Sequence, residues 1–512
     1  MPDSANVNAA IDAWTAALGA EYVITDEQTL ARAETATFAT SQRIKAILRP
    51  ADRDQVQACV LIANNWRVPL YPVSAGKNWG YGSRVPPSDD CVILALGRLD
   101  RIVDFDEKLA YITVEPGVTF EQVNRFLKEN NSRLMINVPG STHQASLIGN
   151  ALERGTAHGL NGDRWTRVCG LEVVMPTGKC IHTGLERFSG ARASKVFAWG
   201  IGPSLDGLFS QSNLGIVTRM TLWLDPIPDF FQYFSFSIEQ EDSLGGLIDN
   251  LQSLRRDGLL ETTCGLYNHY RVLTYLGQYP WDESEGKTPL SSELLNRISG
   301  PLGGGVWFGE GAIIAPNREI GEIKQKHLCA RLRGSVDDLS FKAPNEENPL
   351  IGHGMNTGLS SVYWRKRSAP PEQMDPDVDR CGVIWCCPVS PFSGKAVSRC
   401  LEILERMMVA FGFEPIIGIQ CLSIRAVYVL ASIVYDRNQE GHDETAMQCH
   451  DAALRALADQ GFFPYRLGIQ AMTGVSPSRD DYGWLLRTLK DSLDPFDILA
   501  PGRYDFRQEW PD

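Results

Sequence analysis

The feature that most constrains the fold of this chain is a loop of small residues, PVSAGKNWGYGSRVP, at positions 72–86. It follows a short apolar run, VPLYPV at 68–73, which is typical of a β-strand. Gly76, Gly80 and Gly82 permit positive φ angles and a close approach of the backbone to another group. Their spacing matches neither the dinucleotide-binding fingerprint nor the P-loop. From this stretch alone, a plain surface turn and an anion-binding loop therefore both remain open.

A second glycine-rich segment, NVPGSTHQASLIGNALERGTAHGLNGDRW, occupies positions 137–165. It has few bulky residues between its five glycines, which are Gly140, Gly149, Gly155, Gly159 and Gly162. Two such loops in one domain favour a long, flat ligand that carries phosphate groups. The sequence therefore predicts a nucleotide-like cofactor.

Composition excludes several classes of protein. The chain has 512 residues, and 43% of them are hydrophobic, which is enough for a large core and favours at least two domains. Its net charge of -13 argues against nucleic acid as a partner. The 12 cysteines form no paired CxxC motifs, so we expect reduced thiols, no zinc site and no disulfide framework. Because we find no secretion signal and no apolar run long enough for a membrane span, we expect a cytoplasmic protein.

The order of helical and strand-like patterns suggests two α+β domains and a short tail. Residues 1–225 alternate helices with strands, and Thr119 with Gln122 predicts a capping box at the start of a helix. Two prolines in DPIPDFF, at 225–231, interrupt the pattern. We therefore expect domains at 1–225 and 226–460, followed by a segment at 461–512 whose attachment the pattern leaves open.

Several motifs together resemble the vanillyl-alcohol oxidase and p-cresol methylhydroxylase flavoproteins, a family that includes eugenol oxidase. These motifs are GKNWGYG, VEPGVTF, IGNALERG, GDRW, GLFSQSNLGIVTRMTLWL and DPFDILAPGRYD. The resemblance implies a PCMH-type α+β fold in which the first domain binds FAD, the segment 461–512 returns to complete it, and the middle forms a cap. It implies the following FAD-binding residues: Ser74, Ala75, Gly76, Lys77, Asn78, Gly80, Tyr81, Gly82, Pro139, Gly140, Ser141, Gly149, Asn150, Glu153, Arg154, Gly155, Gly162, Gly215, Ile216, Val217 and Arg503.

The resemblance also implies a chemistry, in which a para-substituted phenol is oxidised at its benzylic carbon. Tyr81, Tyr465 and Arg466 would hold the phenolate, because a guanidinium and two phenol donors lower the pKa of a bound phenol. Hydride would leave toward flavin N5, and the resulting p-quinone methide would give a hydroxylated or aldehyde product. Asp163 would accept a proton near N5. The alternatives are a surface pair for Tyr465 and Arg466, a turn-forming role for Asp163, and a solubilising charge for Arg503.

The chain departs from the family pattern at two positions. Val383 stands where many members carry the His or Tyr that bonds the flavin, so we expect non-covalent FAD. Arg164 stands where vanillyl-alcohol oxidase-like members often have His. Other residues near Val383 in sequence that offer a covalent link are Tyr428, Cys381, Cys386 and Cys387, although core packing explains them more simply.

Three readings of function follow. The first is oxidation of a phenol, with oxygen or a small cytochrome c as electron acceptor. The second is a flavin oxidase of the same fold acting on a non-phenolic alcohol or a secondary metabolite. The third is a binding protein that has kept the fold without the chemistry, against which the intact loops and Asp163 argue. We expect no metal and a homo-oligomer, such as a homodimer.

Overall fold

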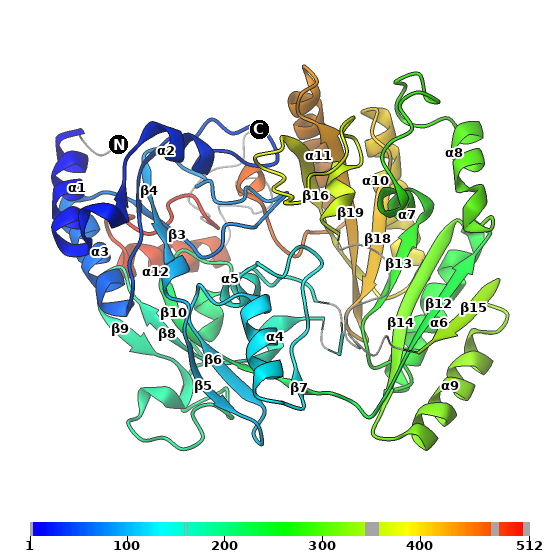
Figure 1. Cartoon of the computed structure of the whole chain (residues 1–512), viewed down its shortest axis with the longest axis horizontal. Helices are drawn as coiled ribbons and strands as arrows, with labels where there is room; N and C mark the ends of the chain where they lie inside the picture. Colours follow the sequence, from blue (N-terminus) through cyan, green and yellow to red (C-terminus); the bar gives the residue numbers. More distant parts are fainter. Residues whose placement is uncertain (1–3, 158, 161, 344–357, 473–480, 505–512) are drawn as a thin grey trace. The chain divides into compact units, whose positions relative to one another are not determined.

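The computed structural model describes residues 4–157, 159–160, 162–343, 358–472 and 481–504 (Figure 1). The chain divides into two compact units. Unit 1 contains residues 1–156, 163–226 and 466–512, and unit 2 contains residues 157–162 and 227–465. No helix in the described ranges is both long and apolar enough to cross a membrane.

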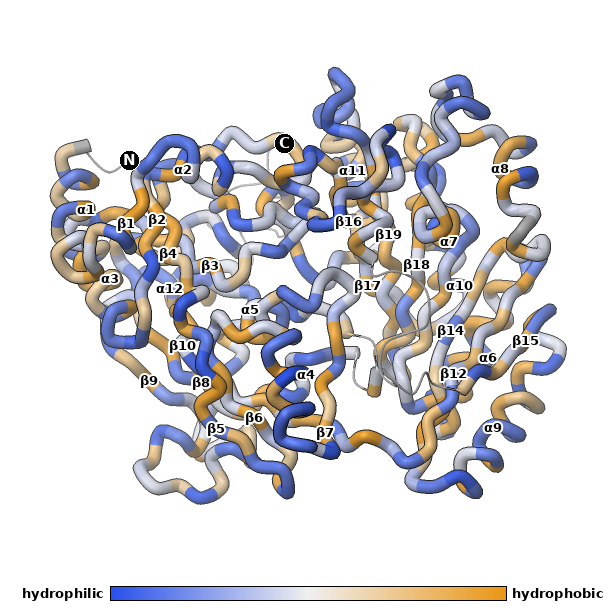
Figure 2. The backbone as a smooth tube through the Cα atoms, in the orientation of Figure 1, coloured by the Kyte–Doolittle hydropathy of each residue, from blue (hydrophilic) through white to orange (hydrophobic). Residues whose placement is uncertain are grey.

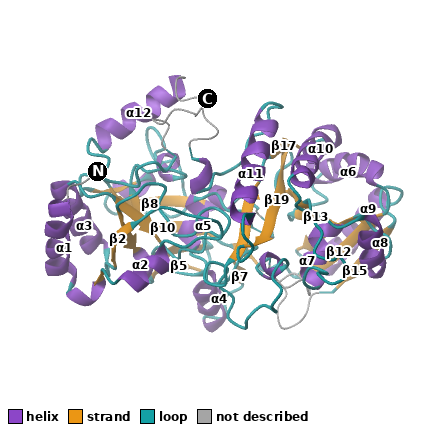
Figure 3. Ribbon diagram, turned by 90° about the horizontal axis from the view of Figure 1, so that it is seen from above, coloured by secondary structure: helices purple, strands orange, loops and turns teal. Residues whose placement is uncertain are grey.

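The first sheet of unit 1 carries the strand that leads into the loop at 72–86. Its order is β1-β2-β4-β3, and β2, β4 and β3 run parallel. The strands β2 and β4 are mostly apolar (Figure 2) and mostly buried, with the exposed Lys45 as the exception in β2. The helices α1 and α3 pack against each other beside this sheet (Figure 3). The elements are α1 (Ser4–Leu18), β1 (Val23–Ile24), α2 (Glu27–Ala33), β2 (Ile44–Leu48), α3 (Arg53–Trp66), β3 (Leu70–Val73) and β4 (Cys91–Ala95).

The second sheet of unit 1 is antiparallel, in the order β5-β6-β10-β8-β9. The predicted capping box is confirmed: Thr119 Oγ1 accepts from the amide of Gln122, whose side chain accepts from the amide of Thr119. The elements are β5 (Ile102–Asp106), β6 (Tyr111–Val114), α4 (Phe120–Glu129), β7 (Leu134–Met135), α5 (Leu147–Leu152), β8 (Val168–Val174), β9 (Cys180–His182), β10 (Ile216–Trp223) and β11 (Asp225–Pro226), which pairs with β7.

The C-terminal segment of unit 1 lies beside β3. The amide of Leu70 donates to the carbonyl of Ile498 at 2.7 Å, and the amide of Ala500 donates to the carbonyl of Leu70 at 2.8 Å. Helix α12 (Asp481–Leu493) precedes this contact. Its Lys490 is buried and forms an ion pair with Asp494 at 2.6 Å. Residues far apart in sequence therefore form one unit around the base of the glycine-rich loop.

Unit 2 is built on one antiparallel sheet in the order β15-β12-β14-β13-β18-β19-β16, with β17 paired to β19. The strands are β12 (Phe230–Ile238), β13 (Cys264–Asn268), β14 (Trp307–Ala315), β15 (Asp338–Lys342), β16 (Cys381–Cys386), β17 (Val389–Pro391), β18 (Ile416–Cys421) and β19 (Ala426–Asp436). The helices are α6 (Leu244–Arg256), α7 (His269–Leu276), α8 (Ser292–Ser299), α9 (Arg318–Leu332), α10 (Gly394–Ala410) and α11 (His442–Ala458).

The two faces of this sheet differ. Helices α10 and α11 pack on one face of β19, where Ile433 and Tyr435 are buried. Successive residues of a strand point to opposite faces, so every second side chain lies on the other face of the sheet. That face carries several half-buried aromatic side chains. We call this opposite face the aromatic face; its side chains include Tyr267, Phe308, Glu310, Trp385, Tyr428, Leu430 and Ser432, as strand register requires.

Candidate functional site

The glycines of the loop at 72–86 are required by its backbone. Gly76, Gly80 and Gly82 have φ angles of 68°, 78° and 109°. These angles lie in the region that side chains with a Cβ rarely adopt. A Cβ added at Gly82 would also lie 2.6 Å from Ile469 Cγ1. The predicted positive φ angles are therefore confirmed, and the close approach of a cofactor to this loop stays a prediction.

The first half of this loop offers free donors, whereas the second half is closed on itself. Among the residues that the structure describes, the amides of Ala75, Gly76 and Asn78 donate to no acceptor. By contrast, the amides of Tyr81 and Ser83 donate to the carbonyl of Asn78 at 3.1 and 3.0 Å. Free amides in a loop with positive φ fit a phosphate group.

The second glycine-rich segment lies against this loop. A Cβ added at Gly149 would lie 3.3 Å from Ser74 Oγ, so the two segments meet at their small residues. Asn150 Oδ1 is buried without a hydrogen-bond partner in the described chain, and a Cβ at Gly155 would lie 2.2 Å from Asn150 Nδ2. A buried acceptor without a partner is costly unless a ligand satisfies it. The residues present therefore fit a cofactor at this place.

Glu153 and Arg503, both predicted to bind the cofactor, are bonded to each other. Arg503 Nη2 lies 2.6 Å from Glu153 Oε1, and Arg503 Nη1 donates to the hydroxyl of Tyr71 at 3.0 Å. The hydroxyl of Tyr504 donates to Glu153 Oε2 at 3.3 Å. Arg503 is buried, so it is not the solubilising charge that the sequence left open. This network fastens the C-terminal segment to β3 and to the end of α5.

Asp163 has the geometry of the simpler alternative, a turn-forming residue. Its carboxylate accepts from the amide of Trp165 at 3.0 Å and caps the short helical turn Arg164–Arg167. Burial raises its pKa, while the hydrogen bond from Trp165 and the charges of Arg154 and Arg164 oppose this shift. A half-buried carboxylate with a raised pKa is suited to accept a proton, so the proton-accepting role stays a prediction.

Arg164, the departure from the family pattern, is buried beside Asp163. Its guanidinium lies 4.6 Å from the ring centroid of Phe120, and its Nη2 donates to the carbonyl of Asn137 at 2.7 Å. Burial lowers its pKa to about 9, although the Asp163 carboxylate partly offsets this effect. The residue therefore places a cation next to Asp163.

Tyr81 and Arg466 are brought together although they are distant in sequence. The Arg466 guanidinium carbon lies 3.8 Å from the ring centroid of Tyr81, and its Nη1 lies 3.4 Å from Asn78 Oδ1, to which it donates. Tyr81 is almost wholly buried and Arg466 is half-buried. A freely solvated surface role for Arg466 does not fit this geometry.

Tyr465 belongs to unit 2, whereas Tyr81 and Arg466 belong to unit 1. Its ring stacks on the ring of Tyr428, with centroids 4.3 Å apart and an interplanar angle of 9°. Its amide donates to the carbonyl of Cys387 at 3.2 Å. The joint action of the three predicted phenolate-binding residues stays a prediction.

The remaining predicted FAD-binding residues have varied surroundings. Ile216 and Val217 are buried in the core of unit 1, and a Cβ at Gly215 would lie 2.5 Å from Val173, so packing explains these small and apolar positions. Gly162 lies in unit 2, where a Cβ would lie 1.9 Å from Leu422 Cδ2. The others comprise exposed Arg154, which donates to Ser210 at 3.0 Å, buried Pro139, exposed Gly140, half-buried Ser141 and half-buried Lys77.

The alternatives to Val383 differ in their surroundings: Tyr428 is half-buried and stacks on Tyr465, whereas the three cysteines are buried. Val383 is fully buried opposite Val434 on β16. Cys381, Cys386 and Cys387 are also buried. Burial raises the pKa of Cys381 to about 12, which keeps this thiol protonated and unreactive.

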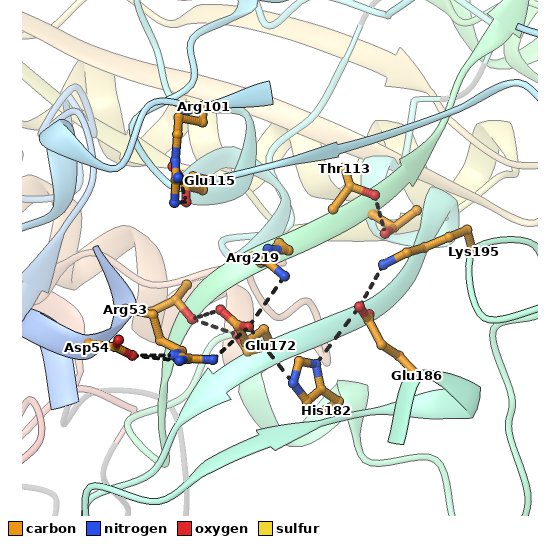
Figure 4. A network of polar contacts seen from close by, with 12 residues as sticks. Arg53, Asp54, Arg101, Thr113, Glu115, Glu172, His182, Glu186, Lys195 and Arg219 are labelled. Carbon is orange, nitrogen blue, oxygen red and sulfur yellow. Dashed lines mark hydrogen bonds and ion pairs between the residues drawn. The ribbon is translucent and has the colours of Figure 1, made fainter. Parts of the chain in front are cut away.

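One group in unit 1 has side chains that a metal ion could use. Among the described residues, Glu172, Cys180 and His182 place their ligand atoms within 4.8 Å of one another. Glu172, however, already faces two cations: Arg219 Nη1 lies 3.5 Å and Arg53 Nη1 lies 3.8 Å from its Oε2 (Figure 4). The network neutralises the buried carboxylate with guanidinium groups, which disfavours a metal cation there.

Sequence reasoning missed the polar residues of the aromatic face in unit 2. Tyr267 donates to Glu310 at 3.2 Å, and Arg271 Nη1 donates to Ser432 Oγ at 3.1 Å. These residues lie on different strands and on a helix, so only strand register could have grouped them. No motif in the sequence gave that register.

Comparisons with known proteins agree with this architecture. A family model described as an FAD binding domain matches residues 44–184. The chain is 44% identical to 1'-carboxy-chondrochloren decarboxylase from Chondromyces crocatus, with 98% of each chain covered. It is 27% identical to the 4-cresol dehydrogenase (hydroxylating) flavoprotein subunit of Pseudomonas putida, with 97% of this chain and 95% of the relative covered.

The fold is also that of a solved structure. A crystal structure of p-cresol methylhydroxylase with substrate bound superposes with a TM-score of 0.91 at 24% identity, and 99% of this chain and 98% of that chain are covered. The expected PCMH-type α+β FAD-binding fold with a cap domain is confirmed. The chain belongs to the vanillyl-alcohol oxidase and p-cresol methylhydroxylase family of flavoproteins.

Proposed function

We propose that this protein is an FAD-dependent enzyme that oxidises a carboxylated secondary metabolite and releases its carboxyl group as CO2. The observation that carries the proposal is the 44% identity, over 98% of both chains, to a protein named as a decarboxylase of 1'-carboxy-chondrochloren. The relative named for cresol oxidation is 27% identical. The secondary-metabolite alternative is thus better supported than simple phenol oxidation.

The residues that would hold FAD are those with unused donors and acceptors in unit 1. The amides of Ala75, Gly76 and Asn78 suit a phosphate, and Asn150 Oδ1 suits a donor on the cofactor. When bound, FAD would supply a two-electron acceptor that takes a hydride equivalent from the substrate. We propose that it is held without a covalent bond, because Val383 carries no nucleophile.

Tyr81 and Arg466 would bind an anionic oxygen of the substrate, such as a phenolate. The guanidinium, whose carbon lies 3.8 Å from the Tyr81 ring centroid, would stabilise the negative charge and lower the pKa of a bound phenol. A phenolate makes the para substituent electron-rich, so a hydride leaves readily from its benzylic carbon. The organic product of that loss is a p-quinone methide.

Loss of CO2 follows from the same electronic arrangement. If a carboxylate sits on the carbon next to the benzylic position, its C–C bond can break and release CO2. The electron pair of that bond then forms the new carbon–carbon double bond and restores the phenolate. In the overall reaction, one aryl acid gives one alkene and one CO2, and one hydride equivalent is transferred to the electron acceptor.

The test uses the purified holoprotein with two phenols that differ in one group. 3-(4-Hydroxyphenyl)propanoate should give 4-vinylphenol and CO2, whereas 4-ethylphenol cannot release CO2. Products are identified by chromatography and by carbon label in the carboxyl group. Flavin reduction by the acid without labelled CO2 would refute the decarboxylation.

Phenol oxidation without decarboxylation is the second candidate, because the relative at 27% identity is named as a 4-cresol dehydrogenase, and the Tyr81–Arg466 contact serves this reaction as well. It would give a hydroxylated or aldehyde product, with oxygen or a small cytochrome c as acceptor. Turnover of 4-ethylphenol combined with no reaction of any aryl acid would select this candidate.

A further inference from the structure

We propose that Arg271 binds the carboxylate of the substrate and so forms an anion-recognition subsite on the aromatic face of unit 2. The inference rests on the proposed function in that it names the acidic substrate class. It stands on four observations about Arg271: its burial, its lack of an acidic partner, its place in helix α7 and its fixed orientation.

Arg271 is a buried cation, with 8% of its surface exposed. No acidic side chain in the described part of the chain forms an ion pair with it. The other deeply buried cations of unit 2 differ: Arg365 pairs with Glu414 at 2.6 Å, and Lys366 pairs with Asp436 at 2.7 Å. Burying a charge without a counter-ion is costly, so an anionic ligand would relieve that cost.

The position of Arg271 in its helix adds to this cost. It lies in the first turn of α7 (His269–Leu276), and its amide donates to the capping side chain of Asn268 at 3.0 Å. The start of a helix carries a partial positive charge, which repels a cation and attracts an anion. A carboxylate bound by Arg271 would therefore interact favourably with both the guanidinium and the helix.

The guanidinium is held in one orientation. Arg271 Nε donates to the hydroxyl of Tyr275 at 3.0 Å, and Nη1 donates to Ser432 Oγ at 3.1 Å. Its carbon lies 5.3 Å from the ring centroid of Trp385 and 5.4 Å from that of Tyr275. Nη2 has no acceptor among the described residues. This leaves a preorganised donor for a carboxylate oxygen.

The subsite shares its face with aromatic groups suited to the rest of an aryl acid. Ser432 and Tyr428 are both on β19, four residues apart, so their side chains point to the same face. Trp385 lies directly opposite Ser432 on β16. Glu310 is an acid on the same face, and it accepts a hydrogen bond from Tyr267 at 3.2 Å. The aromatic face thus has aromatic rings that can pack against an aryl group, and the Arg271 cation lies beside them.

The test measures binding without turnover. The holoprotein is reduced anaerobically beforehand, and calorimetry compares 3-(4-hydroxyphenyl)propanoate with its methyl ester. Wild type should bind the acid at least about tenfold more tightly, since a charge-assisted hydrogen bond is lost in the ester. Arg271→Met should abolish this preference, and Arg271→Lys should keep part of it. Binding of 4-ethylphenol and the FAD content should stay unchanged.

The control is Arg318→Met, because the side chain of Arg318 is 84% exposed and should not affect the preference. The proposal is overturned if wild type does not prefer the acid, or if Arg271→Met keeps the preference. If Arg271→Met fails to fold, the test compares wild type with Arg271→Lys. The measured quantity is then the ratio of the dissociation constants of the methyl ester and the acid in each protein. Because CO2 release is measured separately, a protein that prefers acids without decarboxylating them would refute the proposed function and leave the subsite standing.

Discussion

Substitution of Glu153 by Gln tests whether Arg503 is a structural cation or a cofactor ligand. Glu153 Oε1 lies 2.6 Å from Arg503 Nη2, and the side chain of Arg503 is only 9% exposed. Removing one partner of a buried pair typically costs about 3–5 kcal/mol. Because Gln keeps an acceptor and Arg503 keeps its bond to Tyr71, we expect roughly 2–3 kcal/mol. At roughly 2–4 °C per kcal/mol for a unit of this size, that lowers the melting temperature by about 4–12 °C.

The assay is thermal unfolding of apoprotein and holoprotein, with Glu121→Gln as the control. Glu121 is 52% exposed beside His143, so its substitution should cost less than about 1 kcal/mol. Arg503→Met together with Glu153→Gln should recover part of the loss, because no buried charge is then left unpaired. The reasoning is refuted if Glu153→Gln matches the control while Arg503→Met lowers only the FAD content. Arg503 would then serve the cofactor directly.

Four further outcomes are expected. Gly82→Ala should cost roughly 2–4 kcal/mol, through its positive φ and its steric clash, and lower FAD retention, whereas Gly207→Ala, with open space around it, should not. Arg466→Ala should abolish flavin reduction by 4-ethylphenol and leave FAD bound; normal reduction would contradict the phenolate role. Acid precipitation should release free FAD, given Val383, and colour kept in the precipitate would reveal a covalent link. Burial lowers the pKa of His269 to about 4, so the unfolded chain takes up the proton first. Stability should therefore fall as pH drops from about 6.5 to 4, and His269→Phe should flatten that slope in pH-dependent melting curves.

The parts of the fold that sequence reasoning predicted are those set by local chemistry. The strand before the loop, the positive φ angles of Gly76 and Gly82 and the capping box at Thr119 each depend on a few neighbouring residues. Asp163 shows the same rule, since the turn-forming alternative followed from its immediate sequence.

Features that depend on distant residues were not predictable in this way. Arg503 and Glu153 form an ion pair although they are 350 positions apart, and no local sequence pattern predicts it. Arg271 became a candidate only when β19 placed Ser432 beside it. Family resemblance supplied the cofactor and the Tyr81–Arg466 contact, but it favoured the chemistry of its better-known members over that of the relative at 44% identity.

Single turnover with a carboxyl-labelled aryl acid tests the central claim most directly. The oxidised holoprotein is mixed anaerobically with 3-(4-hydroxyphenyl)propanoate. The amounts of reduced flavin and of labelled CO2 are then measured in the same reaction. We expect one CO2 for each flavin reduced, with 4-vinylphenol as the organic product. Flavin reduced in full with the label still on the organic product would contradict it.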